Sequence, residues 1–292
     1  MDRRALVMKK KPISIVFLLS FVAFLILFDS LIGYVAESYW TVPYNDYEVT
    51  RQAHPEKVWD KVFYGNSVVI SAYREDVSQA GYVNFGIDYG VVTDLWDFIR
   101  KGQISIGSEL VIGLNLFTLY DNFDTNPAYL CHKGIPEPYC YFHRDKLLRI
   151  SSDAEKLYKN EAIQPWYKRL YYGCLSDAQL QEKLEKYEAD YFCLPISDFR
   201  KNLEALDHIA RWCEKEGVRL RILWMPYNPS VSQPELMTQL MEQVNAWCDS
   251  KDIIHEDFTN RLDESCFHDV GHLNHEHGSY IFTEVADQWL IN

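Results

Sequence analysis

The sequence predicts an α/β protein in which a parallel sheet carries helices on both of its faces. Short apolar runs that end in polar turns alternate along the chain with segments whose apolar residues recur at helical spacing. No internal repeat or low-complexity tract interrupts this alternation. Strands that alternate with helices form parallel sheets, because each helix crosses a face of the sheet to reach the next strand.

Five apolar runs are expected to form the strands. The first lies in "VFYGNSVVISAY" and ends in a Gly-Asn-Ser turn, and the second lies in "YVNFGIDYG" and ends at a glycine turn. The third covers residues 110–114. The fourth, in "VRLRILWMPYNP", is stopped by Pro226, which cannot donate to a sheet. The fifth is the short run "DIIHEDF".

Helices are expected between and after these strands. "VVTDLWDFIRKG" has apolar residues at helical spacing and stops at Gly102. "SDFRKNLEALDHIARWCEKEG" is amphipathic, with Ser197 or Asp198 as its N-cap and Gly217 at its end. "ELMTQLMEQVNAWCDSK" and the closing "GSYIFTEVADQWLIN" complete the set.

Residues from about 118 to 195 depart from this pattern and are interpreted as an insertion or lid. The stretch is rich in tyrosine and contains one helical piece, "SDAQLQEKLEKYEADY", with Ser176 or Asp177 as its N-cap. Two interpretations remain open for its aromatic cluster, a wall that stacks on carbohydrate or ordinary core packing. The cluster consists of Trp166, Tyr167, Tyr171 and Tyr172.

The N-terminus has the pattern of a membrane anchor. Residues 1–11 form a basic tail, and residues 12–35 are apolar enough to span a bilayer as a helix. Basic residues on the N-terminal side favour a cytoplasmic N-terminus, with the rest of the chain outside. A cleaved signal peptide is the alternative, but Tyr34 fits poorly before a cleavage site. A polar connector is expected over 36–60, followed by the α/β domain over 61–292.

The charge of the chain argues against nucleic acid as a partner. The formal net charge is -13. Residues 1–11 contain five basic residues and one acid, a net charge of +4, so the rest of the chain carries a net charge of -17. Phosphate backbones require a basic surface. Acidity of this kind serves solubility in most proteins.

Seven cysteines are present and none forms a C-x-x-C pair, which argues against a zinc ribbon or a thioredoxin-like site. An extracytoplasmic location permits disulfides. Cys131 and Cys140 bracket a turn-rich stretch and could close a small loop. The odd count leaves at least one free thiol.

Four polar motifs stand where the strands end or the last helix begins. They place Ser67, Gly86 and Asn115 after the first three strands, and the pattern Asp269-x-x-His272 before the closing helix. A nucleophilic serine needs a histidine base, and that base needs a carboxylate to orient it. The oxyanion that develops needs backbone N–H groups or an asparagine amide. These residue types are all present, so they are candidates for one site.

A metal site is the alternative interpretation of the histidine-rich stretch "HDVGHLNHEHG". Its spacing does not match H-E-x-x-H, and Gly271 weakens any helix that would align His268 with His272. We therefore expect no metal, and expect His275 and His277 to be exposed polar residues at the rim or cap of the last helix. Asn274 is expected to cap the closing helix.

The blocks "YGNS", "NFGID", "IGLN" and "DVGH" resemble, in order, the four sequence blocks of the SGNH (GDSL-like) hydrolase superfamily. The resemblance spans residue 63 to the end, apart from the insertion. The tail "DVGHLNHEHG" is similar to that of membrane-anchored members, which include lipoteichoic-acid D-alanylation accessory proteins and alginate- and cellulose-acetylation proteins. Two departures are Asn66, where the family usually has Asp, and the missing acid after Asn115.

This resemblance implies a three-layer α/β/α fold with a parallel, flavodoxin-like five-stranded sheet. It implies that Ser67 is the nucleophile, that His272 is the general base and that Asp269 orients His272. The oxyanion hole would consist of the N–H groups of Ser67 and Gly86 and the amide of Asn115. No cofactor and no metal are implied.

The function implied is that of an extracytoplasmic, membrane-anchored serine esterase or O-acyltransferase acting on acyl esters of a cell-envelope polymer, either a polysaccharide or a teichoic acid. The implied partner is a multi-span membrane-bound O-acyltransferase. The alternative is a non-catalytic binding or assembly partner that keeps the same fold. In that case Ser67 and His272 would lie too far apart, or Asn115 would point away from them.

Overall fold

The structure is a computed structural model that describes residues 15–39, 43, 45–123, 125, 129, 132, 153–156, 158–159 and 166–292. The chain divides into two compact units. One comprises Met1–Val42 and Lys133–Ile163, and the other comprises Pro43–His132 and Gln164–Asn292. The sheet and the candidate site described below belong entirely to the second unit.

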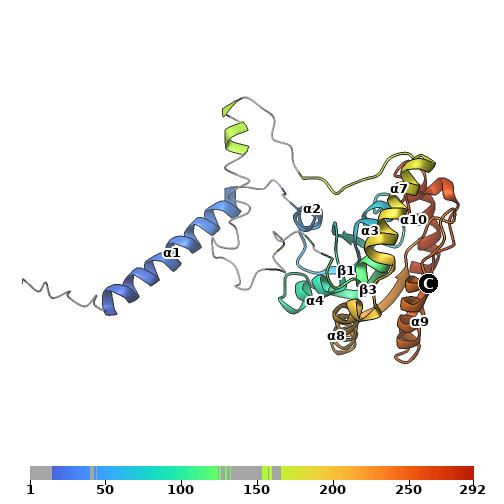
Figure 1. The fold of residues 1–292 in the computed structure, drawn as a ribbon. Helices are drawn as coiled ribbons and strands as arrows, with labels where there is room; N and C mark the ends of the chain where they lie inside the picture. The colour runs from blue at the N-terminus through green and yellow to red at the C-terminus, as the bar shows by residue number, and fades with distance from the viewer. Residues whose placement is uncertain are drawn as a thin grey trace, which may run out of the picture. The chain divides into compact units, whose positions relative to one another are not determined.

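Five strands form one parallel sheet with the order β2-β1-β3-β4-β5 (Figure 1). This is the flavodoxin-like order, so the fold class expected from the sequence is confirmed. The strands are β1 (Trp59–Gly65), β2 (Val83–Gly86), β3 (Ile106–Leu114), β4 (Arg219–Trp224) and β5 (Ile254–Asp257).

Helices cover both faces of the sheet (Figure 1). The α-helices of this unit are α2 (Asp46–Ala53), α3 (Ser67–Ala72), α4 (Val92–Arg100), α5 (Leu116–Leu119), α7 (Asp177–Tyr187), α8 (Arg200–Glu216), α9 (Glu235–Asp249) and α10 (Gly278–Leu290). Short helices among the described residues include the π-helix η2 (Glu188–Phe192) and the 3-10 helices η3 (Ile196–Phe199) and η4 (Glu264–Cys266).

The alternation of side chains along the strands divides the core into two clusters. Val62 and Ile222 point toward α4, α8 and α9, whereas their neighbours Phe63 and Leu223 point toward α3 and α10. A fully buried side chain of this size contributes about 2 kcal/mol to stability. A slip of one residue in the strand register would exchange the two sets, so the apolar pattern fixes the register.

The α/β unit begins earlier than the sequence indicates. The expected connector over 36–60 contains α2, whose Asp46 is buried. The Asp46 carboxylate accepts hydrogen bonds from Trp166 Nε1 at 2.7 Å and from the backbone N–H of Asp88 at 2.7 Å. It also accepts one from the Tyr129 hydroxyl at 3.2 Å. The helix is therefore part of the unit that starts at Pro43, because it joins the insertion to the loop after β2.

Helix ends follow the expected signals in part. Gly217 ends α8 with φ of 73°, a left-handed conformation that glycine adopts without strain. Neither Ser197 nor Asp198 caps this helix, because η3 precedes it. The Asp121 carboxylate instead accepts from the N–H groups of Lys201 at 2.9 Å and Asn202 at 3.0 Å. Because Asp121 is about 80 positions away from the start of α8, the sequence around the helix start does not indicate this cap.

The N-terminal unit contains a helix that is long and apolar enough to cross a membrane. This helix, α1 (Ile15–Tyr39), includes the apolar stretch Ile15–Ile32. The loop that Cys131 and Cys140 would close lies outside the described residues. Five cysteines within the described part of the chain are free thiols, namely Cys174, Cys193, Cys213, Cys248 and Cys266.

Gly278, at the start of α10, is expected to tolerate no side chain. A Cβ at this position would lie 1.9 Å from the carbonyl oxygen of Cys266, which is backbone and cannot rotate away. Gly278→Ala should therefore lower the free energy of unfolding by about 3 kcal/mol, measured by denaturant unfolding followed by circular dichroism. Gly271→Ala is the control, since its Cβ would meet nothing closer than Val68 Cγ2 at 3.8 Å. Equal stability of the two variants would contradict this packing.

Candidate active site

Ser67 stands at the junction of β1 and α3. The residue before it, Asn66, is the N-cap of α3, and its side-chain oxygen accepts the N–H of Val68 at 3.0 Å. Gly65 lets the strand pass close to the helix, because a Cβ there would lie 2.3 Å from Val69 Cγ2. The backbone N–H of Ser67 has no hydrogen-bond partner among the described residues. The backbone thus turns sharply between β1 and α3, and the Ser67 hydroxyl lies at the carboxyl edge of the sheet.

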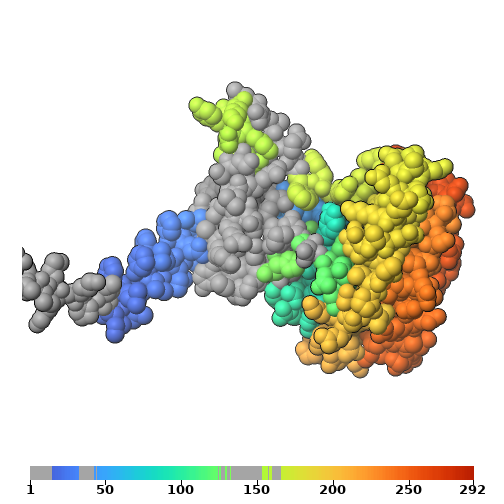
Figure 2. Space-filling view, in the orientation of Figure 1, coloured from blue at the N-terminus to red at the C-terminus, as the bar shows by residue number. Residues whose placement is uncertain are grey.

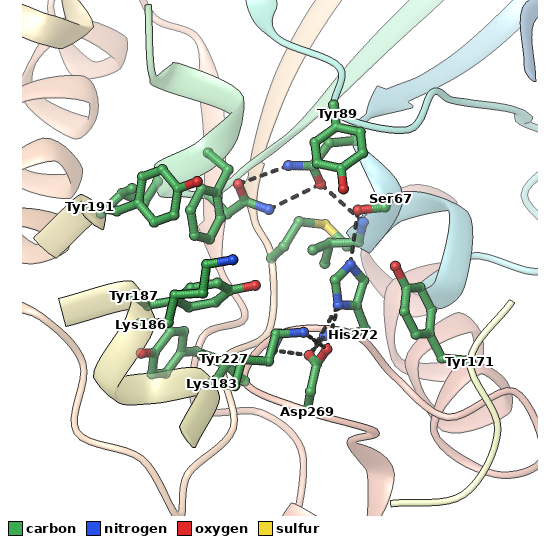
Figure 3. A pocket seen from close by; sticks show the side chains of 18 of the residues that line it. Ser67, Tyr89, Tyr171, Lys183, Lys186, Tyr187, Tyr191, Tyr227, Asp269 and His272 are labelled. Carbon is green, nitrogen blue, oxygen red and sulfur yellow. Dashed lines mark hydrogen bonds and ion pairs between the residues drawn. The ribbon is translucent and has the colours of Figure 1, made fainter. Parts of the chain in front are cut away.

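Ser67, His272 and Asp269 form a continuous hydrogen-bonded chain (Figure 3). Ser67 Oγ lies 2.8 Å from His272 Nε2, although the residues are 205 positions apart. His272 Nδ1 lies 2.8 Å from Asp269 Oδ2 and 3.0 Å from Oδ1. In this order the serine can give its proton to an imidazole whose other nitrogen is held by a carboxylate.

The Asp269 carboxylate also fixes the backbone that carries His272. Its Oδ1 accepts the N–H groups of Gly271 at 3.0 Å and His272 at 2.8 Å, and the residue is buried. Burial by itself would raise the pKa of Asp269. The charges and hydrogen bonds of His272 and Lys183 outweigh burial and hold the pKa well below its usual range. Asp269 is therefore ionised at neutral pH.

Asn115 follows β3 and pairs with Asn66 through both amide groups. Asn115 Nδ2 donates to Asn66 Oδ1 at 3.2 Å, and Asn66 Nδ2 donates to Asn115 Oδ1 at 3.1 Å. Asn115 Oδ1 also accepts the N–H of Thr118 at 2.9 Å, which fixes the amide orientation. Asn115 lines the same cavity as Ser67, and its second Nδ2 hydrogen has no acceptor among the described residues.

Gly86 is not brought to the site, contrary to the expectation from the sequence. Its N–H donates to Asn84 Oδ1 at 2.9 Å, and Gly86 does not line the cavity. The loop that follows β2 places Asp88 and Tyr89 there instead. Tyr89 has φ of 58°, a left-handed conformation that is uncommon for tyrosine and that no sequence pattern here signals.

The candidate site opens into a cavity of about 520 Å³ with mainly apolar and aromatic walls. The helix α7 and the π-helix η2 form one wall, and Figure 2 shows α7 in yellow on the surface of the unit. Apolar walls with a few convergent polar groups are typical of small-molecule sites. Residues that line these walls include Phe117, Tyr171, Lys183, Lys186, Tyr187, Tyr191 and Met225.

The four aromatic residues of the insertion cluster lie in different environments. The Tyr171 ring stacks on His272, with centroids 4.0 Å apart and planes 22° from parallel. Burial raises the pKa of Tyr171, so its phenol stays protonated. Of the remaining three residues, Trp166 binds Asp46, and Tyr167 and Tyr172 are exposed. Only Tyr171 of the four lines the cavity, and it does so against the imidazole.

Lys183 is a site residue that the sequence analysis did not identify. It lies on α7, and its ammonium group forms an ion pair with Asp269 Oδ2. Lys186, one turn further along, also lines the cavity, and Figure 3 shows both lysines on the side opposite Ser67. The sequence correctly predicted the helix α7. The spacing of its apolar residues does not indicate which of its side chains contact Ser67, His272 or Asp269.

The four histidines of the C-terminal stretch have separate environments. His272 binds Ser67 and Asp269, whereas the His268 ring lies 3.0 Å from the carbonyl oxygen of Tyr172. Within the part of the chain that the structure describes, no three His, Cys, Asp or Glu side chains are placed to hold a metal ion. Asn274 Oδ1 accepts the N–H of Gly278 at 2.9 Å at the start of α10, as expected of a capping residue.

For the esterase activity expected from the sequence, Asn115→Ala should lower kcat by about 10²–10³-fold, because the expected amide donor to the oxyanion is lost. It also removes the cap at Thr118, which costs about 1 kcal/mol of stability. Asn115→Asp separates these effects, since it keeps the capping oxygen and lacks the amide donor. Both variants should lose activity alike in steady-state assays. Wild-type activity in Asn115→Asp would exclude the donor role.

The chain matches no protein-family model, and no curated protein matches its sequence.

Proposed function

We propose that this protein is a membrane-anchored serine enzyme that cleaves or transfers acyl esters. The observation that carries the proposal is the chain from Ser67 Oγ to His272 Nε2 at 2.8 Å and from His272 Nδ1 to Asp269 at 2.8 Å. A serine, an imidazole and a buried carboxylate in this order form the arrangement that activates a hydroxyl for attack on a carbonyl carbon.

The reaction follows from the positions of these groups. His272 Nε2 takes the proton as Ser67 Oγ bonds to the ester carbonyl carbon. The resulting oxyanion is stabilised by the Ser67 N–H and the Asn115 amide. The carbon–oxygen bond to the alcohol then breaks, and His272 returns the proton to the alcohol. The acyl group on Ser67 passes to water or to a hydroxyl acceptor by the same steps in reverse.

Transfer to a hydroxyl of a cell-envelope polymer is the activity that we propose over simple hydrolysis. Support comes from the resemblance of the sequence blocks to anchored members of the SGNH superfamily. The same resemblance suggests a multi-span membrane-bound O-acyltransferase as the partner that supplies the acyl group. Figure 3 shows Tyr187 across the cavity from Ser67.

A non-catalytic binding protein with this fold is the alternative. Such a protein has no need of a hydrogen bond between Ser67 and His272, or of an ionised carboxylate behind the imidazole. The 2.8 Å distance between Ser67 and His272 and the position of Asn115 both favour the catalytic proposal.

Labelling with a fluorophosphonate tests the proposal on the full chain in detergent. We expect the wild-type protein to be modified at Ser67, as found by mass spectrometry, and His272→Ala to lose the label. Ser71→Ala is the matched control, because Ser71 lies on the same helix with its hydroxyl bonded to the carbonyl of Val68. Absence of label on folded wild-type protein would contradict the proposed function.

We further propose that α1 anchors the chain with its N-terminus in the cytoplasm and the α/β unit outside. The basic residues of the first eleven positions support this orientation. A membrane-impermeant maleimide tests it, because Cys174 and Cys193 are exposed free thiols. In a protein whose Cys131 and Cys140 are already replaced by serine, intact cells should give labelling that is lost when Cys174 and Cys193 are replaced as well. Labelling only after cell lysis would place the unit on the inner side.

A further inference from the structure

The Asp269 carboxylate binds more than the histidine that it orients. Its Oδ2 lies 2.8 Å from His272 Nδ1 and is also the oxygen paired with the Lys183 ammonium group. The Asp269 side chain is 1% exposed and that of Lys183 is 27% exposed. The N–H groups of Gly271 and His272 already hold Oδ1. The turn and the imidazole are therefore fixed without Lys183, which adds a permanent positive charge.

We infer that Lys183 acts through Asp269 and weakens His272 as a base by sharing the Asp269 carboxylate. It thereby sets the pH above which the site is active. The inference rests on the serine mechanism proposed above.

The physical basis is the repulsion between two positive charges that share one carboxylate. Protonated His272 is stabilised by Asp269, and Lys183 competes for the same oxygen. Like charges a few ångströms apart near a protein surface shift a titration by about one unit. The other groups that face this carboxylate and imidazole are Asp88, Tyr171 and Tyr187, with Arg169 beside Tyr171. Both phenols are protonated near neutral pH, because burial raises their pKa values.

Asp88 and Arg169 do not replace Lys183 in this role. Burial and the neighbouring Asp46 raise the pKa of Asp88, whereas Arg169 and His272 lower it. Arg169 lies over the Tyr171 ring, 5.1 Å from its centroid, and makes no ion pair with Asp269 within the described ranges. Lys183 is thus the cation in contact with the triad carboxylate.

Helix α7 carries the Lys183 ammonium group and does not belong to the hydrophobic core. Its residues are exposed or only partly buried, and a π-helical turn, η2, follows it directly. Replacing Lys183 should therefore leave the fold intact. Lys186 lies on the same helix and lines the same cavity, but makes no ion pair with Asp269. It is a matched control that removes the same charge from the same wall.

The test is the pH dependence of kcat/KM for a small neutral ester, with full-length protein in detergent. Lys183→Met should move the midpoint of the acidic limb upward by about one unit, because protonated His272 is no longer opposed by a cation. Lys183→Arg should keep the wild-type midpoint, and Lys186→Met should move it by less than about 0.3 units. An unmoved midpoint in Lys183→Met, or an equal shift in Lys186→Met, overturns the inference. A purely structural lysine would raise KM at every pH without moving the midpoint.

Titration of His272 by NMR separates this inference from the proposed function. Protein labelled with ¹³C-histidine gives the His272 signal by comparison with His272→Gln. If Ser67 takes no label and no ester is cleaved, the proposed function fails. The His272 midpoint should nevertheless rise in Lys183→Met, and an equal midpoint in both proteins overturns the role of Lys183. Lys183→Gln serves as a second variant if Lys183→Met does not fold by circular dichroism.

Discussion

Ser67→Ala is expected to lower kcat/KM for hydrolysis of 4-nitrophenyl acetate by at least about 10⁴-fold. Ser67 Oγ is the hydroxyl that contacts His272 Nε2, at 2.8 Å. Alanine leaves the carbonyl carbon without a nucleophile, while the Asn115 amide remains in place. The cap at Asn66 and the helix α3 do not depend on the Ser67 hydroxyl, so the thermal unfolding temperature should stay within a few degrees of wild type.

The interpretation of this loss depends on its controls. Ser71→Ala changes the same helix and should retain activity within a factor of about three, because it is not bonded to the imidazole. Activity that survives in purified Ser67→Ala protein would place ester cleavage at another site in the molecule. Such a result would remove the basis of the proposed function even if the fold were unchanged.

Asp269→Asn is expected to lower kcat/KM by about 10⁴-fold while leaving the backbone turn intact. An asparagine oxygen can still accept the N–H groups of Gly271 and His272. Its NH2 group then replaces Oδ2 and faces His272 Nδ1, which must become an acceptor. The proton moves to Nε2, and this nitrogen can no longer take the proton of Ser67. The loss therefore comes from the wrong tautomer of the imidazole.

The same substitution places an amide NH2 against the Lys183 ammonium group, so the lysine loses its partner. Glu276→Gln is a suitable control, because Glu276 lies on the same loop and binds the N–H of Gly173 but not the triad. Steady-state assays across pH 5–9 should show near wild-type activity in the control. Activity within tenfold of wild type in Asp269→Asn would mean that Asp269 does not set the tautomer.

Much of the site could be predicted because it is built from strand ends. Asn115 directly follows β3, Ser67 comes two positions after the end of β1, and Asp269 and His272 precede the last helix. A parallel sheet brings such positions to one edge whatever their separation in sequence. The apolar runs predicted the strands well, because a strand that is covered on both faces reads as a short continuous apolar run.

The prediction that the Gly86 N–H faces the site was wrong, because nearby side chains compete for a backbone N–H group. The N–H of Gly86 is occupied by the side chain of Asn84, two residues before it. A side chain that bonds to a nearby N–H group is not apparent from the residue types alone. The loop then continues to Tyr89, whose positive φ no composition would suggest.

Tyr171 and Lys183 could not be predicted because they come from the insertion. Their contacts with His272 and Asp269 depend on how the insertion packs against the strand ends. No periodic pattern links that stretch to the sheet. The spacing of α7 predicts a helix but not the direction of its polar face, since none of its residues is buried.

The separation of Ser67 and His272 has a consequence for synthesis of the protein. The two residues are 205 positions apart, and His272 lies between the last strand and the last helix. At about 5–20 residues per second, Ser67 leaves the ribosome roughly 10–40 s before His272 does. During that interval the serine has no imidazole partner and its hydroxyl is an ordinary alcohol. On the mechanism that we propose, the nascent chain is therefore inert toward esters until almost all of it has been made, and Ser67 becomes a nucleophile only as the C-terminal helix folds against the sheet.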